Sequence, residues 1–128
     1  MTKTSEIKLI NCNITILEHV ISGDKVLAKE LNINIPNKWS EFGTGAFEYV
    51  LKKVSANPED CKWWAYLPML KHSNTLIGSC GYKGKADDNG RIEIGYEIAL
   101  SYRNNGYATT VAQLYHLAMA EKKMLILN

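Results

Sequence analysis

Apolar and polar positions alternate strictly between Arg91 and Ile98. Isoleucine or tyrosine stands at every second position, and Glu93, Gly95 and Glu97 stand between them. A period of two residues is that of a β-strand whose two faces meet different surroundings. The pattern therefore predicts a strand with one apolar face and one face that carries two carboxylates.

The period changes after this strand. Val111, Leu114, Tyr115 and Ala118 recur at the spacing of one face of an α-helix, which is expected to begin near Ala108. A short polar turn that contains a glycine lies between the strand and the helix. The sequence thus predicts a strand–turn–helix unit over residues 90–121.

The rest of the chain is expected to form short strands and helices joined by loops. Pro36 rules out a regular helix in the segment that ends with Trp39, so this segment is expected to be a loop, and Trp39 either packs on the core or lines a cleft. The other expected elements are strands over 6–10, 62–69, 75–83 and 123–128, two helices that meet at Gly23 and end near Leu31, and a third helix marked by Phe47, Val50, Leu51 and Val54. Consecutive strands joined by short loops predict an antiparallel meander, and a last strand reached through a helix is expected to lie parallel to the strand before it.

The turn before the long helix is the first candidate for chemistry. A helix that opens with Gly106 and Ala108 leaves its first backbone N–H groups uncovered, and the helix dipole favours an anion there. The alternative is structural: Gly106 permits an unusual backbone angle, and Asn104 or Asn105 caps the helix. Spacing alone leaves both interpretations open.

Composition narrows the class of protein. The 128 residues suit one domain, and 15 basic against 13 acidic residues give a net charge of +2, with no dense basic run that would indicate nucleic-acid binding. Cys12, Cys61 and Cys80 match neither a zinc site nor a disulfide framework, so no metal is expected. No apolar run is long enough for a membrane span, and the expected location is the cytoplasm.

The strand–turn–helix unit resembles the central motif of the GNAT superfamily of acetyl-CoA-dependent N-acetyltransferases. In that motif a strand is followed by Arg/Gln-x-x-Gly-x-Gly/Ala and a helix, which are Arg103, Gly106 and Ala108 here. The resemblance implies an α/β (α+β) fold with a mixed sheet, an antiparallel meander and helices on both faces, in a single domain over 1–128. It also implies a shortened C-terminal part, because such a domain continues through one more helix and two more strands.

The resemblance also implies an acetyl-CoA site. The backbone N–H groups of the turn would bind the pyrophosphate, with Arg103 beside it, and the strand end would pair with the pantetheine amides, with a backbone N–H near Ile98 polarising the thioester carbonyl. The residues concerned are Ile98, Ala99 and Leu100 at the strand end and Arg103, Asn104, Asn105, Gly106, Tyr107 and Ala108 in the turn.

Glu93 and Glu97 are the candidates for the general base. An amine with a pKa of about 10 needs help to lose its proton near neutral pH, and a carboxylate can supply it directly or through water. Both residues lie on one face of the strand, so spacing does not separate them, although Glu93 is slightly preferred. The alternative is that both belong to a solvated strand face.

Three functions remain open. The first is transfer of an acetyl group from acetyl-CoA to the amine of a small molecule or peptide. The second is a non-catalytic CoA-binding module, because the tyrosine that protonates the leaving thiolate in many family members lies on the helix that this sequence lacks. The third is an interaction protein that forms a homodimer through an exposed sheet edge, after Leu100 or at 125–127.

Overall fold

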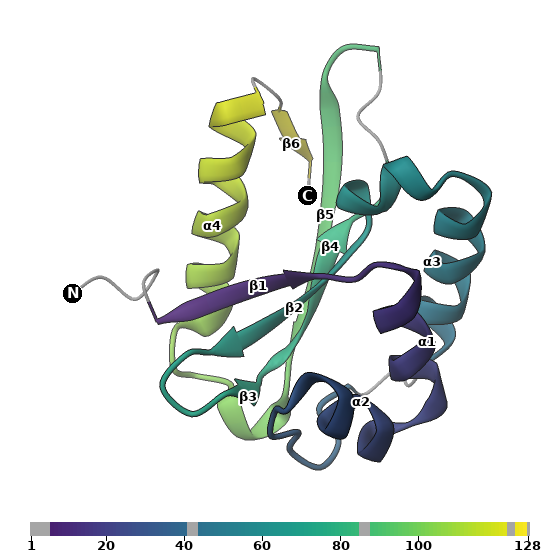
Figure 1. Cartoon of the computed structure of the whole chain (residues 1–128). Helices are drawn as coiled ribbons and strands as arrows, with labels where there is room; N and C mark the ends of the chain where they lie inside the picture. The colour runs from purple at the N-terminus through teal and green to yellow at the C-terminus, as the bar shows by residue number, and fades with distance from the viewer. Residues whose placement is uncertain (1–5, 41–43, 85–87, 123–124, 128) are drawn as a thin grey trace.

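The computed structural model describes residues 6–40, 44–84, 88–122 and 125–127; the side chains of residue 92 and of residues from 115 onward are not described. Its elements follow the chain in the order shown in Figure 1. They are β1 (Ile7–Asn11), α1 (Ile14–Ser22), α2 (Asp24–Leu31), α3 (Gly45–Ala56), the 3₁₀ helix η2 (Pro58–Trp63), β2 (Ala65–Leu70), β3 (Thr75–Leu76), β4 (Gly78–Tyr82), β5 (Arg91–Ile98), the 3₁₀ turn η3 (Leu100–Tyr102), α4 (Tyr107–Lys122) and β6 (Leu125–Leu127).

The strands form one mixed sheet in the order β1-β2-β4-β5-β6, with β3 paired to β2. All pairings are antiparallel except that of β5 with β6, which is parallel. The structure confirms both the meander and the parallel last strand expected from the sequence. Residues 123, 124 and 128 of the expected last strand lie outside the described part of the chain.

Helices cover both faces of the sheet, as expected. In Figure 1, α1, α2 and α3 lie on one face and α4 lies on the other. The core is divided accordingly into two clusters of buried side chains. One cluster contains Leu17, Leu27, Phe47, Val54 and Leu67, and the other contains Leu70, Ile77, Tyr82, Ile94 and Val111.

The strand predicted over 62–69 begins later than expected. Pro58 is compatible with the first turn of a helix, and the 3₁₀ helix that it opens continues through Trp63, where the Trp64 N–H donates to the Cys61 carbonyl at 3.2 Å. Because Trp63 is buried in the cluster on the α4 face, its packing holds the helical turn in place. The sheet pairing of β2 therefore starts at Ala65.

The strand predicted over 75–83 contains a β-bulge. The Ile77 N–H donates to Pro68, whereas Cys80 lies opposite Tyr66, so three steps along β3 and β4 match two steps along β2. One residue is therefore extra on this strand, which bends it and divides it into β3 and β4. The pairing with β5 continues without interruption through the bulge.

Trp39 packs in the core rather than in a cleft. Its side chain is 5% exposed, and its ring centroid lies 5.7 Å from that of Phe47. The indole Nε1 donates to Asp24 Oδ1 at 2.9 Å, which satisfies its polar end. Of the two alternatives for Trp39, the structure supports core packing.

Candidate active site

One edge of β5 is open along most of its length. The parallel pairing with β6 covers Arg91 to Glu93. From Ile94 to Ile98 this edge has no strand partner among the described residues. An unpaired strand edge presents a row of N–H and C=O groups that can bind an extended ligand.

The hydrogen bonds to β4 show which backbone groups face that edge. The Glu93 carbonyl accepts from the Lys83 N–H at 2.9 Å, and the Ala99 N–H donates to the Ile77 carbonyl at 2.7 Å. In a strand, the N–H and C=O groups of successive residues face opposite edges. The groups of Ile98 and of every second residue before it therefore face the open edge. The N–H of Ala99 is thus used within the sheet.

The turn that follows β5 has two residues in the left-handed region. These residues are Asn104 and Gly106, with φ values of 66° and 78°. Leu100, which begins η3, is 63% exposed. Asn105 closes the turn, because its side-chain amide donates backwards to the carbonyls of Tyr102 and Arg103 at 3.2 and 3.1 Å. Positive φ explains why a glycine stands at 106.

The first turn of α4 is suited to an anion. The Thr110 N–H and Oγ1 both donate to the Gly106 carbonyl, at 3.1 and 3.0 Å, so the helical hydrogen bonds begin there. The N–H groups of Tyr107 and Ala108 precede the first of these bonds and have no partner within the helix. Asn104, Asn105 and Gly106 are exposed, so a ligand can approach the turn.

Arg103 connects this turn to the strand. Its Nε donates to the Ile98 carbonyl at 2.8 Å, so the guanidinium lies against the end of β5. Arg103 therefore holds the open edge and the turn next to each other. The resemblance to the family had implied only that Arg103 lies beside the pyrophosphate. The strand end and the turn form one continuous site.

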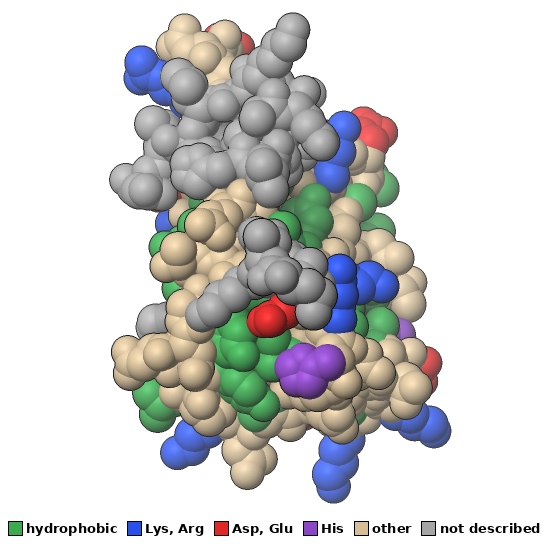
Figure 2. Space-filling view, turned by 90° about the vertical axis from the view of Figure 1, so that its left-hand side faces the viewer, with side chains coloured by type: hydrophobic (Ala, Val, Ile, Leu, Met, Phe, Trp, Pro, Cys, Tyr) green, Lys and Arg blue, Asp and Glu red, His purple; other side chains and the backbone are tan. Residues whose placement is uncertain are grey.

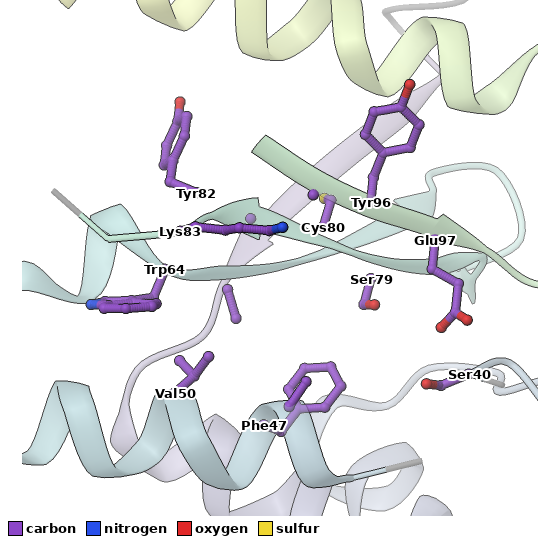
Figure 3. A pocket seen from close by; sticks show the side chains of 14 residues that line it. Ser40, Phe47, Val50, Trp64, Ser79, Cys80, Tyr82, Lys83, Tyr96 and Glu97 are labelled. Atoms are coloured by element: carbon purple, nitrogen blue, oxygen red, sulfur yellow. The ribbon is translucent and has the colours of Figure 1, made fainter. Parts of the chain in front are cut away.

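A cavity of about 380 Å³ lies against the face of β5 that is turned toward α3. It is bounded by β4, β5 and α3. Figure 3 shows Ser79 and Glu97 pointing from the sheet toward α3, and Tyr82 and Tyr96 pointing away toward α4. Gly81 and Gly95 face each other across the two strands and both line the cavity.

The two glycines differ in what a side chain would meet. A Cβ on Gly81 would lie 2.1 Å from the Trp64 carbonyl oxygen, so the close approach of β2 excludes any larger residue there. A Cβ on Gly95 would meet only the flexible end of Lys83, at 3.3 Å. Gly81 is therefore required by the fold, whereas Gly95 mainly keeps the cavity open.

The cavity has apolar walls and two polar ends. Phe47, Val50 and Trp64 line it on the helix side. Ser79 and Glu97, which are cross-strand partners, form one end. At the other end the Lys83 ammonium lies 3.3 Å from Glu93 Oε1, with the two side chains 60% and 51% exposed.

The structure thus gives the two candidate glutamates different surroundings. They share one strand face, as expected, but Glu97 lines the cavity and Glu93 forms an exposed ion pair. The sequence did not indicate the cavity, because its walls come from α3 and η2–β2, far from β5 along the chain. The only available signal was glycine at alternate strand positions, and which glycines pair depends on the register of β4 against β5.

The opposite face of the sheet carries two phenols, the half-buried Tyr66 and the buried Tyr82. Tyr66 and Tyr82 are in edge contact, with ring centroids 6.1 Å apart, and the Tyr66 hydroxyl donates to the Lys62 carbonyl at 2.8 Å. Burial, with smaller contributions from nearby thiols, raises the pKa of Tyr66 to about 12. Burial and the neighbouring phenol also raise the pKa of Tyr82. Both groups therefore resist ionisation in the folded protein.

These shifts predict a loss of stability in alkali. Between the ordinary tyrosine pKa of 10 and about 12, the unfolded chain loses the Tyr66 proton and the folded chain keeps it. The unfolded state then binds fewer protons, so the free energy of unfolding falls as pH rises through this window. Urea unfolding from pH 9 to 12 should show a shallower fall for a Tyr66→Phe/Tyr82→Phe variant. Tyr49→Phe, at a ring that is 56% exposed, should follow the parent, and equal slopes in all three proteins would contradict the assignment.

Charge and metal-ligand chemistry point to no other site. Within the described ranges, no group of three or more His, Cys, Asp and Glu side chains could hold a metal ion. None of the helices in the part of the chain searched is long and apolar enough to cross a membrane. On the face shown in Figure 2, the Lys and Arg side chains that are drawn are scattered and do not gather into one large patch.

Comparisons with known proteins agree with this geometry. Residues 31–125 match the sequence model of the acetyltransferase (GNAT) domain. An uncharacterized N-acetyltransferase of Bacillus subtilis (strain 168), YjdG, is 27% identical over 115 residues, which are 88% of this chain and 68% of that protein.

Solved structures share the fold. A GNAT-family acetyltransferase from Bacillus anthracis superposes with a TM-score of 0.54 at 21% identity, over 93% of this chain and 66% of that one. A Salmonella typhimurium acetyltransferase described as modifying the N-terminal serine of ribosomal protein L7/L12 gives 0.58 at 17% identity, over 94% and 67%. The microcin C7 self-immunity acetyltransferase MccE, solved with acetyl-CoA and AMP, gives 0.58 at 13% identity, over 94% and 66%. The chain spans about two thirds of the length of these relatives.

The family match covers most of the chain and includes the open strand edge and the glycine turn. The chain therefore belongs to the GNAT acetyltransferase family.

Proposed function

We propose that this protein transfers an acetyl group from acetyl-CoA to a primary amine. The observation that carries the proposal is the continuity of the open β5 edge with the uncovered helix N-terminus, joined by the bond from Arg103 to Ile98. The extended thioester arm of acetyl-CoA leads into a pyrophosphate, so its binding needs both features in that order. The N-acetyltransferase name of the Bacillus subtilis relative and the acetyl-CoA bound to MccE agree with it.

The pyrophosphate would lie on the turn formed by Asn104, Asn105 and Gly106, where it accepts from the first N–H groups of α4, those of Tyr107 and Ala108. The pantetheine amides would pair with the edge of β5 that ends at Ile98, Ala99 and Leu100. Because the Ala99 N–H already donates to Ile77 and the Ile98 carbonyl accepts from Arg103, we assign the pairing chiefly to the outward-facing backbone groups of the alternate residues before Ile98, which leaves the Ile98 N–H for the thioester.

The reaction is a direct displacement. The amine nitrogen forms a bond to the thioester carbonyl carbon, the carbon–sulfur bond breaks, and the sulfur leaves as a thiolate that takes up a proton. The Ile98 N–H, which faces the edge where the thioester would lie, stabilises the oxyanion. The chain's part is to align the two reactants and to remove the proton from the ammonium group.

Of the two carboxylates, Glu97 is better placed to take the proton from the acceptor's ammonium group. It lies one residue before Ile98 and lines the cavity from which an amine could approach. Glu93 is not among the residues that line the cavity, and its carboxylate lies beside Lys83 at the far end. We therefore assign the general base to Glu97, acting directly or through water.

Calorimetric titration with acetyl-CoA, followed by an assay of free thiol released in the presence of mixed primary amines, tests the proposal. Saturable binding together with amine-dependent release of CoA thiol is the expected result. Saturable binding without thiol release would instead indicate a CoA-binding module. A folded chain that binds no acetyl-CoA would overturn both, and the mass of the protein in solution would then test pairing through the open edge.

A further inference from the structure

We infer that the acceptor is a small primary monoamine with an apolar body, held in the cavity between α3 and the β4–β5 pair. This inference rests on the proposed function and adds the substrate class. The amine would lie at the Glu97 end, and the body would lie over Gly95 against Phe47, Val50 and Trp64 (Figure 3).

The walls favour an apolar body. Phe47 and Val50 present a ring and a branched aliphatic side chain from α3, and Trp64 closes the cavity beside β2. The floor is the backbone of Gly81 and Gly95, which adds no polar side chain. Burial of an aryl or alkyl group here would remove apolar surface from water, which favours binding.

The arrangement of charge favours a single ammonium group. Glu97 supplies a negative charge at the end next to Ile98, and the Lys83 ammonium stands at the other end. A polyamine that placed one ammonium at Glu97 would bring a further one toward the pair formed by Lys83 and Glu93. Because the Glu93 carboxylate is already paired with Lys83, a second ammonium gains little there, so polyamines should be poor acceptors.

The backbone of the cavity floor disfavours a peptide acceptor. The hydrogen bonds between β4 and β5 pair the backbone groups of Gly81 with those of Gly95 and the groups of Ser79 with those of Glu97, so the amides of these floor residues are already used. A peptide's amides would enter an apolar cavity without matching partners, which costs free energy. A volume of about 380 Å³ is also at the lower end of the range for small-molecule sites, about 300–1,000 Å³.

The position of the cavity suits the transfer. The Glu97 side chain points into the cavity, and the next residue, Ile98, presents its N–H to the open edge where the thioester would lie. An amine held at Glu97 would thus be adjacent to the acetyl carbon without displacing the thioester. Proximity of this kind is the main contribution that binding can make to a direct displacement.

The first test is a comparison of four acceptors by release of CoA thiol. Phenethylamine represents the apolar monoamines, 2-methoxyethylamine the polar ones, spermidine the polyamines, and a tetrapeptide with N-terminal serine the protein N-termini. We expect kcat/KM for phenethylamine to exceed each of the others by tenfold or more. Equal values, or a preference for any other acceptor, would overturn the inference while leaving the acetyltransferase proposal intact.

Variants of the cavity supply the second test. Gly95→Val should raise KM for phenethylamine at least tenfold and leave acetyl-CoA affinity unchanged, because its side chain fills the floor and meets only the end of Lys83. Val50→Ser should reduce the preference for phenethylamine over 2-methoxyethylamine. Val26→Ser, at a 38% exposed valine on α2, is the matched control and should keep the parent preference.

A binding measurement separates failure of this inference from failure of the proposed function. Phenethylamine is titrated calorimetrically into the protein saturated with CoA, and no turnover is needed. Binding that is lost in Gly95→Val supports the cavity assignment even if no thiol is ever released. Absence of binding, or binding that Gly95→Val leaves unchanged, contradicts it even if other amines are acetylated.

Discussion

Replacing Gly106 by tryptophan is expected to weaken acetyl-CoA binding by about 100-fold or more. Hydrogen bonds to a charged group contribute about 1.5–3 kcal/mol each, and every 1.4 kcal/mol is a tenfold change in Kd. An indole at this position would cover the N–H groups of both Tyr107 and Ala108, so both bonds to the pyrophosphate would be lost, at a cost of about 3 kcal/mol or more. Calorimetric titration of the folded variant gives the Kd directly.

Gly106→Ala is the matched control for backbone strain. Gly106 has φ of 78°, and a non-glycine residue there costs about 1–2 kcal/mol whatever its size. The alanine variant shares this cost but covers little of the turn, so its affinity for acetyl-CoA should fall by no more than about tenfold. If the tryptophan variant binds as tightly as the alanine variant, the pyrophosphate does not lie on this turn.

Replacing Glu97 by glutamine is expected to lower kcat by about 10²- to 10⁴-fold, the usual contribution of a general base. Glutamine keeps the size and the hydrogen-bonding capacity of the side chain but cannot take the proton from an ammonium group. The acetyl-CoA affinity should stay within about threefold of the parent, because the turn at Gly106 is untouched. Steady-state thiol release, with acetyl-CoA titration beside it, separates the two effects.

Glu93→Gln is the control for a carboxylate on the same strand face. Its partner Lys83 and its own side chain are both more than half exposed, so the pair contributes little, and kcat should change by less than about threefold. A collapse of kcat in Glu93→Gln, with Glu97→Gln close to the parent, would move the general base to Glu93. Loss in neither variant would indicate that the amine loses its proton without a carboxylate.

The elements around the site could be predicted because their patterns are local. Strict alternation marked β5, and helical spacing marked α4, which begins at Tyr107, one residue before the expected start. Gly106 stands where the backbone needs positive φ, so the turn too was readable. The strand boundary at 62–69 was wrong because burial of Trp63 favours a 3₁₀ turn over the strand that the local pattern suggested.

The sequence by itself determined the strand, the glycine turn and the helix to which we assign acetyl-CoA, and it limited the candidate bases to two glutamates on one strand face. Only the tertiary structure distinguished Glu97 in a cavity from Glu93 in an exposed ion pair, and only it showed that Arg103 binds the end of β5. The reason is physical. Periodicity and turn preferences involve residues a few positions apart, whereas the cavity depends on the register that pairs Gly81 with Gly95 and on a helix more than thirty residues away along the chain, which no local pattern encodes.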